Sequence, residues 1–268
     1  MTSARPAIVL VHGLWMTPLS WEHWIARYEA AGYQVHAPAW PGLDGSVEDL
    51  RRDTAPYARL GITEIVDHYD RIIRALDVPP IIMGHSFGGA FVEVLLDRGL
   101  GAAGIAIDAA PTRGVLKLPL ATLRSASPVL RNPANYRKAV MLTPKQFHYA
   151  FTNTLSEQES LPVYERYAVP GPGRVLFQGA LANTNRRSPL RIEYDRRERA
   201  PLLLIGGGVD HTVPASVNRA NYKLYRKSAA IVAYREFPGR SHYTLGQDGW
   251  EEVADYALDW AVTPRTGA

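Results

Sequence analysis

The chain has 268 residues, which is enough for one large core or for a core with an inserted subdomain. It contains no cysteine, which excludes disulfides and thiolate metal sites. The formal charge of +4 is small, and the basic residues do not cluster as strongly as in a nucleic-acid-binding protein. No stretch approaches the roughly 18 apolar residues of a membrane span. No signal-like apolar region follows Met1. We therefore expect a cytoplasmic protein with neither a nucleic acid nor a membrane as partner.

The first 110 residues alternate between apolar runs and helical patterns. Residues 7–11 are continuously apolar and mostly β-branched, which is typical of a strand buried on both faces of a parallel sheet. The same pattern predicts strands at 34–37, 81–83 and 104–108 and helices at about 18–31, 63–76 and 89–96.

This alternation breaks over residues 111–198. They contain no comparable β run, and we predict short helices at 119–125, 133–140, 144–154 and 157–167. Alternation resumes with a strand at 201–206, a helix at 215–227, a strand at 231–237 and a helix at 249–261. The pattern predicts an α/β fold with a mostly parallel sheet of about six strands and helices on both faces. Residues 1–110 and 199–268 would form the core, and 111–198 a helical cap.

The segment Gly84-His85-Ser86-Phe87-Gly88 lies between an expected strand and an expected helix. A nucleophile elbow requires this order, in which a strand is followed by G-x-S-x-G and then by a helix. A strand that turns into a helix without a loop forces its central residue into strained backbone angles, and glycines on either side prevent clashes. The helix N-terminus adds a partial positive charge suited to a developing oxyanion. The alternative is an inert serine in a small-residue turn.

His242 follows the last expected strand and precedes the last helix. A serine hydroxyl needs a base whose pKa lies near the working pH, and imidazole supplies one. The whole chain resembles the α/β-hydrolase superfamily, in which the catalytic residues follow in the order Ser, Asp, His. The resemblance rests on four features: His12-Gly13, the elbow at Ser86, an acid after strand 201–206 and the late histidine. Because no strand precedes residue 7, the sheet is shorter than the eight-stranded form.

The resemblance implies roles for further residues. Asp210 lies in a turn similar to the family's G-x-x-D-x-x-x-P and would orient His242; Asp108, at the end of strand 104–108, is the rival acid. The oxyanion would bind the backbone N–H groups of Leu14 and Phe87.

Several aromatic residues are candidates for a substrate pocket. Trp15 follows the His-Gly turn, and its alternative is ordinary packing. Phe147 and Phe151 lie in the most aromatic stretch of the expected cap; they would line an acyl or aryl pocket or form the cap's own core. We expect the arginine-rich segment 186–199 to form a solvated face; the alternative is that it steers an anionic substrate.

Taken together, these residues predict a serine hydrolase that needs no cofactor and no metal. Ser86, His242 and Asp210 would cleave a carboxylic ester, lactone or similar acyl bond of a small molecule through an acyl-enzyme. The alternatives are perhydrolase (haloperoxidase) or lyase chemistry on the same scaffold, and a ligand receptor with residual hydrolase activity. The sequence does not indicate the oligomeric state.

Overall fold

The apolar runs of the sequence form one six-stranded parallel sheet in a computed structural model that describes residues 5–266. The strand order is β2-β1-β3-β4-β7-β8, and each neighbouring pair is parallel. The strands are β1 (Ile8–Val11), β2 (Val35–His36), β3 (Ile81–His85), β4 (Ala103–Ile107), β7 (Leu202–Gly207) and β8 (Val232–Phe237). The prediction of about six parallel strands is confirmed.

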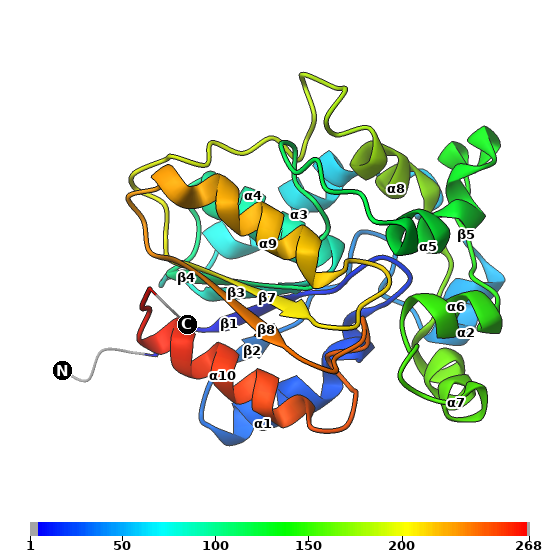
Figure 1. Ribbon diagram of the computed structural model, residues 1–268. Helices are drawn as coiled ribbons and strands as arrows, with labels where there is room; N and C mark the ends of the chain where they lie inside the picture. Colours follow the sequence, from blue (N-terminus) through cyan, green and yellow to red (C-terminus); the bar gives the residue numbers. More distant parts are fainter. Residues whose placement is uncertain (1–4, 267–268) are drawn as a thin grey trace.

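Helices cover both faces of this sheet (Figure 1). Successive strand residues point to opposite faces, so Ile8 and Leu10 of β1 pack with one set of helices while Val9 and Val11 pack with the other. The first set is α1 (Glu22–Ala30) and α10 (Trp250–Val262). The second face carries α3 (Ile62–Arg74), α4 (Phe87–Asp97) and α9 (Ala215–Leu224). Because both faces are covered, the strands read as uninterrupted apolar runs.

Shorter elements differ from the predictions. The expected helix at 18–31 is a 3-10 turn, η1 (Pro18–Trp21), followed by α1. Residues between the strand at 34–37 and the helix at 63–76, for which no element was predicted, contain α2 (Val47–Arg52). Ser46 caps this helix by accepting a hydrogen bond from the Asp49 N–H. A further 3-10 turn, η3 (Tyr225–Lys227), ends α9.

Residues 111–198, called the insertion below, stay outside the six-stranded sheet. Figure 1 shows their helices at the end of the molecule toward which the strand arrows point, and the segment after α8 runs back to the start of β7. They contain α5 (Leu120–Leu130), η2 (Pro133–Arg137), β5 (Ala139–Val140), α6 (Pro144–Ala150), α7 (Glu157–Tyr167), β6 (Gly171–Pro172) and α8 (Gly173–Ala180). The two short strands pair antiparallel. Helix α8 was not predicted, because it begins at a glycine preceded by Pro170-Gly171-Pro172, which signals a turn.

No helix within residues 5–266 is both long and apolar enough to cross a membrane.

A buried carboxylate joins α4 to the second half of the core. Glu93 is fully buried; its Oε1 accepts a hydrogen bond from Asn221 Nδ2 (2.8 Å) and its Oε2 one from the Tyr225 hydroxyl (2.6 Å). Burial raises the pKa of Glu93 to about 7, although these two hydrogen bonds and the Arg199 charge oppose the shift.

The protonation of Glu93 predicts how stability varies with pH. In the unfolded chain the carboxyl titrates near its ordinary pKa of 4.5, whereas the folded protein holds the proton up to about pH 7. Stability from this group is therefore complete below pH 4.5 and is lost as the pH rises to 7, on the order of 3 kcal/mol in all. Glu93→Gln, which does not titrate, should flatten the pH dependence of the urea-unfolding free energy over this range. The exposed Glu48→Gln is the control, and an unchanged slope in Glu93→Gln would contradict the assignment.

Candidate active site

Ser86 lies at the turn between β3 and α4, with φ 57° and ψ −120°. This backbone conformation costs a non-glycine residue on the order of 1–3 kcal/mol. Close packing on either side holds it: a Cβ on Gly84 would lie 2.2 Å from Gly88 O, and one on Gly88 would lie 2.1 Å from Val11 O. The Ser86 N–H also donates to Ile107 O (2.9 Å) on the neighbouring strand. The surrounding backbone therefore fixes the strained turn.

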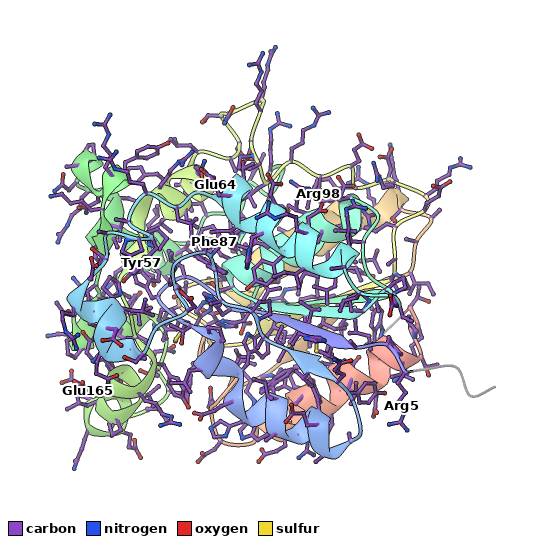
Figure 2. The ribbon with its side chains drawn as sticks, turned by 180° about the vertical axis from the view of Figure 1, so that it is seen from behind. Arg5, Tyr57, Glu64, Phe87, Arg98 and Glu165 are labelled. Carbon is purple, nitrogen blue, oxygen red and sulfur yellow. The ribbon has the colours of Figure 1, made fainter. Side chains whose placement is uncertain are left out.

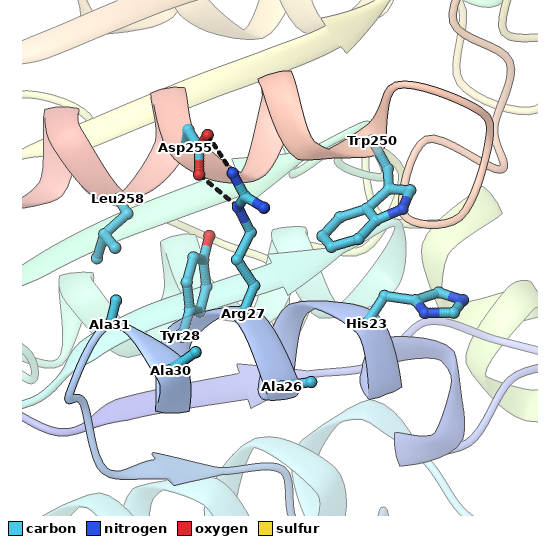
Figure 3. Close-up of a pocket in the computed structure, with 9 residues that line it drawn as sticks. All are labelled: His23, Ala26, Arg27, Tyr28, Ala30, Ala31, Trp250, Asp255 and Leu258. Carbon is cyan, nitrogen blue, oxygen red and sulfur yellow. Dashed lines mark hydrogen bonds and ion pairs between the residues drawn. The ribbon is translucent and has the colours of Figure 1, made fainter.

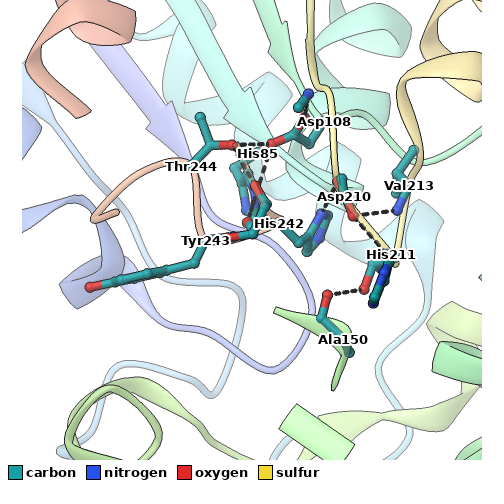
Figure 4. Close-up of polar contacts among 12 residues, drawn as sticks. His85, Asp108, Ala150, Asp210, His211, Val213, His242, Tyr243 and Thr244 are labelled. Atoms are coloured by element: carbon teal, nitrogen blue, oxygen red, sulfur yellow. Dashed lines mark hydrogen bonds and ion pairs between the residues drawn. The ribbon is translucent and has the colours of Figure 1, made fainter. Parts of the chain in front are cut away.

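His242 and Asp210 are joined, side chain to side chain, in a fully buried pair (Figure 4). The loop after β7 presents Asp210, whose Oδ1 accepts hydrogen bonds from the N–H groups of Thr212 (2.6 Å) and Val213 (2.9 Å). Its Oδ2 accepts the third, from His242 Nδ1, at 2.6 Å. This bond fixes the imidazole so that its Nε2 is the atom left for chemistry.

Two opposing effects act on the pKa of the His242 imidazole. Burial lowers the pKa of His242, but the Asp210 charge, the hydrogen bond to Asp210 and the more remote Asp108 charge outweigh it, and the net pKa is raised. His242 Nε2 is buried without a hydrogen-bond partner among the described residues, so it is not bonded to Ser86. Catalytic hydrogen bonds are often long before substrate binds. The Phe151 ring packs edge-on against the imidazole, 4.9 Å between centroids.

Asp108 lies near this pair but does not bond to the imidazole. Its Oδ1 accepts a hydrogen bond from the Gly207 N–H (2.6 Å), and its Oδ2 lies 2.7 Å from Thr244 Oγ1. Burial and the Asp210 charge raise the pKa of Asp108 to about 7. The hydrogen-bonding geometry thus favours Asp210 over Asp108 as the partner of His242.

Two other buried histidines hold loops in place. His85 Nε2 donates to the carbonyl of His242 (2.9 Å), which ties the residue before Ser86 to the histidine loop. His12 Nδ1 donates to Gly13 O (3.0 Å), and its Nε2 accepts from the Trp40 N–H (3.1 Å). Burial lowers the pKa of both rings, that of His12 to about 4. Both are therefore neutral at pH 7.

The loop after β1 approaches Ser86 closely. A Cβ on Gly13 would lie 2.9 Å from Ser86 Cβ, so only glycine fits there. Leu14 follows in this loop, and Phe87 is the first residue of α4, where a backbone N–H has no partner within the helix. These two residues carry the N–H groups that are predicted to form an oxyanion hole.

A cavity of about 140 Å³ lies beside Ser86, between the core and the insertion. Trp15 and Phe87 line it from the core, as does Val213. Apolar side chains line it from the insertion: Leu118, Leu123, Ala126, Leu130 and Leu176. Sequence reasoning missed these residues, which lie in α5, in α8 and, for Leu118, just before α5. The only signal was the density of leucine after residue 115.

Phe147 and Phe151, for which the sequence left a pocket lining and the cap's own core open, are not among the residues that line this cavity. Both side chains are buried, and their rings stack on each other at 4.8 Å. Phe147 also packs against Tyr164 of α7. These aromatics form the insertion's own core, and only Phe151 reaches the site, through the His242 ring.

Hydrogen bonds fasten the insertion to the loops that carry the acid and the histidine. Thr212 Oγ1 donates to Ala150 O (2.7 Å), and the Tyr243 N–H donates to Phe151 O (2.9 Å). Asn153 Nδ2 donates to Val209 O (2.9 Å). The end of α6 therefore holds both loops in register, as Figure 4 shows for Ala150.

The alpha/beta hydrolase family matches residues 8–256. The chain belongs to this family. An extracellular alpha/beta hydrolase from a Paenibacillus species is 18% identical, with a TM-score of 0.66 over 95% of this chain and 98% of that one. A pyrethroid hydrolase from Sphingobium faniae is 19% identical, with a TM-score of 0.64 over 97% of this chain and 99% of that one. A monoacylglycerol lipase from Paleococcus ferrophilus is 20% identical, with a TM-score of 0.65 over 97% of this chain and 96% of that one. No curated protein matches the chain.

A second hollow of this alpha/beta hydrolase, about 610 Å³, lies between α1 and α10 (Figure 3). Its charged groups already bond to each other, since Arg27 donates from Nε (2.5 Å) and from a terminal nitrogen (2.6 Å) to the two oxygens of Asp255. It contains no residue predicted to react. Figure 2 shows Phe87, from the cavity beside Ser86, in the interior of the molecule, far from this hollow's helices.

His85, Asp108 and His242 place one potential metal-ligating atom each within 4.8 Å of one another. Two of the three side chains are already engaged: His85 Nε2 donates to a carbonyl, and the two oxygens of Asp108 lie in hydrogen bonds with the Gly207 N–H and Thr244 Oγ1. These contacts leave His85 and Asp108 without a free ligand atom for a metal ion.

The pKa of His242 can be tested without any substrate. Asp210→Asn should lower it below its wild-type value, because the largest favourable charge is lost. Asp108→Asn should lower it less, since Asp108 acts only through its more remote charge. The imidazole resonances should be followed by NMR over the acid-to-neutral range. Equal shifts, or a larger one in Asp108→Asn, would assign the acid to Asp108.

Proposed function

We propose that this protein is a serine hydrolase that cleaves carboxylic esters or similar acyl bonds. The observation that supports this best is the buried Asp210–His242 pair, which leaves the imidazole Nε2 without a partner among the described residues. The backbone of His242 is hydrogen-bonded to His85, the residue before the strained Ser86 at the cavity. The solved structures that resemble this fold include a pyrethroid hydrolase and a monoacylglycerol lipase, which is consistent with ester cleavage.

The reaction follows from the chain's own groups. Ser86 Oγ attacks the carbonyl carbon while His242 Nε2 takes its proton, and Asp210 stabilises the imidazolium. The N–H groups of Leu14 and Phe87 donate to the oxyanion. His242 then returns the proton to the leaving alkoxide, which leaves Ser86 acylated. Water, deprotonated by the same nitrogen, adds to the acyl carbon and releases the acid and the free serine.

The insertion would act as a cap that selects the acyl or leaving group. It supplies most of the apolar lining, so the cavity favours an uncharged, hydrophobic group. Thr122 Oγ1 is buried without a partner among the described residues and belongs to this lining, which leaves one hydrogen-bonding position for a polar atom of the substrate.

The nucleophile can be tested by covalent labelling. A fluorophosphonate should modify Ser86, and peptide mass mapping should locate the adduct. Ser86→Ala should lose the label, and its ester turnover should fall by on the order of 10⁶ with the fold intact, because only a hydroxyl is removed. Unfolding by urea serves as the control for the fold. Labelling of another residue, or retention of a tenth of the activity, would exclude this mechanism.

The cavity predicts a change in acyl-chain preference. Ala126→Leu adds volume inside the lining, whereas Ala121→Leu adds it elsewhere on α5. In Ala126→Leu we expect kcat/KM to fall about tenfold or more for p-nitrophenyl octanoate and little for the acetate, which needs only the reacting groups. Ala121→Leu should match wild type on both esters. Equal losses on both esters in Ala126→Leu would show that this cavity does not hold the acyl chain.

A further inference from the structure

Four leucines near the cavity are exposed to solvent within eight residues of the insertion. Leu116 is 81% exposed, Leu118 60%, Leu120 83% and Leu123 43%. We call them the leucine strip. The other large apolar residues that are exposed in the described chain, such as Leu19, Leu161 and Val262, are scattered singly, which is normal for a surface. A cluster of this kind marks an interaction site.

The leucine strip is continuous with the cavity beside Ser86. Leu118 and Leu123 are exposed and also line the cavity, so they form its rim. Leu116 and Leu120 are the most exposed of the four and lie outside the lining. An apolar chain that contacts these outer leucines can therefore enter the cavity without crossing water.

The segment that contains the leucine strip carries charges of one sign. Residues 109–156 contain no aspartate or glutamate but seven lysines and arginines: Arg113, Lys117, Arg124, Arg131, Arg137, Lys138 and Lys145. None of the seven forms a salt bridge with a described carboxylate, although the rest of the chain has many such pairs. Lys117 is exposed between Leu116 and Leu118. This segment therefore attracts anions that carry apolar groups.

We propose that the leucine strip and its surrounding cations dock on an anionic lipid surface and take up ester substrates from it. Leucines that enter the acyl boundary while lysine and arginine contact acidic headgroups are the physical basis of peripheral membrane binding. The chain would lie on the membrane and not span it. A protein partner would be expected to meet a mixed-charge rim, whereas here acidic groups are absent from the whole segment. The docking itself goes beyond the proposed hydrolase activity and does not require it, whereas the uptake of ester substrates rests on that proposed function.

Binding can be measured without turnover, by flotation with sonicated vesicles of phosphatidylglycerol and of phosphatidylcholine. We expect the wild-type protein and Ser86→Ala to bind the anionic vesicles about tenfold or more tightly than the zwitterionic ones, and less tightly as salt rises. The double variant Leu116→Ser/Leu120→Ser should lose about tenfold or more in binding. Leu161→Ser, an exposed leucine on α7, should not.

A charge pair completes the test. Lys117→Glu/Arg131→Glu should weaken binding to phosphatidylglycerol, whereas Arg226→Glu/Lys227→Glu, a matched exposed pair on η3, should not. Hydrolysis of monomeric p-nitrophenyl acetate should be unchanged in the leucine double variant, because Leu116 and Leu120 do not line the cavity.

Three outcomes would overturn the docking proposal. The first is wild-type protein that does not float with phosphatidylglycerol vesicles. The second is equal loss of binding in the matched controls. The third is a wild-type dimer, measured by light scattering, that the leucine substitutions convert to a monomer, which would make the leucine strip an interface between copies. Vesicle binding by a protein that hydrolyses no ester would instead refute the proposed function alone.

Discussion

The close approach of backbone to backbone around Ser86 is the constraint on which the site depends. Gly88 packs so tightly on Val11 O that any side chain would clash, and Gly13 has the same relation to Ser86 Cβ. The end of β1, the end of β3 and the start of α4 are therefore in contact through main-chain atoms. This contact brings the loop with Leu14 beside the N-terminus of α4, where Phe87 lies. The strain at Ser86 persists because its surroundings leave no room for relaxation.

The insertion contributes to the site chemically as well as by covering it. The end of α6 receives hydrogen bonds from the loops of Asp210 and His242, and Phe151 packs on the imidazole. This packing excludes water from His242, which by itself lowers the pKa of the ring. Asp210 reverses the shift because its charge and hydrogen bond act at 2.6 Å in the same dry environment. The pKa of His242 therefore depends on how the insertion packs against the ring.

The sequence predicted the elements whose patterns are local and strong. The apolar runs indicated the sheet, and G-x-S-x-G between strand and helix located the turn at Ser86. The pairing of His242 with Asp210 followed from a family resemblance. Predictions for the insertion were weaker, since an aromatic stretch such as Phe147 to Phe151 fits a core and a pocket equally well. The packing of α5 and α8, which decides between the two, is a tertiary property, and helix α8 begins where proline and glycine signal a turn.

The hydrogen bonds of Thr244 indicate which protonation state of Asp108 satisfies every neighbouring group. Thr244 Oγ1 lies 2.7 Å from both Asp108 Oδ2 and Ser241 O, but a hydroxyl has a single proton to donate. The carbonyl can only accept. If Asp108 is protonated, its Oδ2–H donates to Thr244 Oγ1, which donates to Ser241 O, and every group is satisfied. If Asp108 is ionised, one acceptor loses its donor. This geometry agrees with the pKa of about 7 that burial and the Asp210 charge give Asp108. Asp210, by contrast, accepts three hydrogen bonds, and one of them comes from His242.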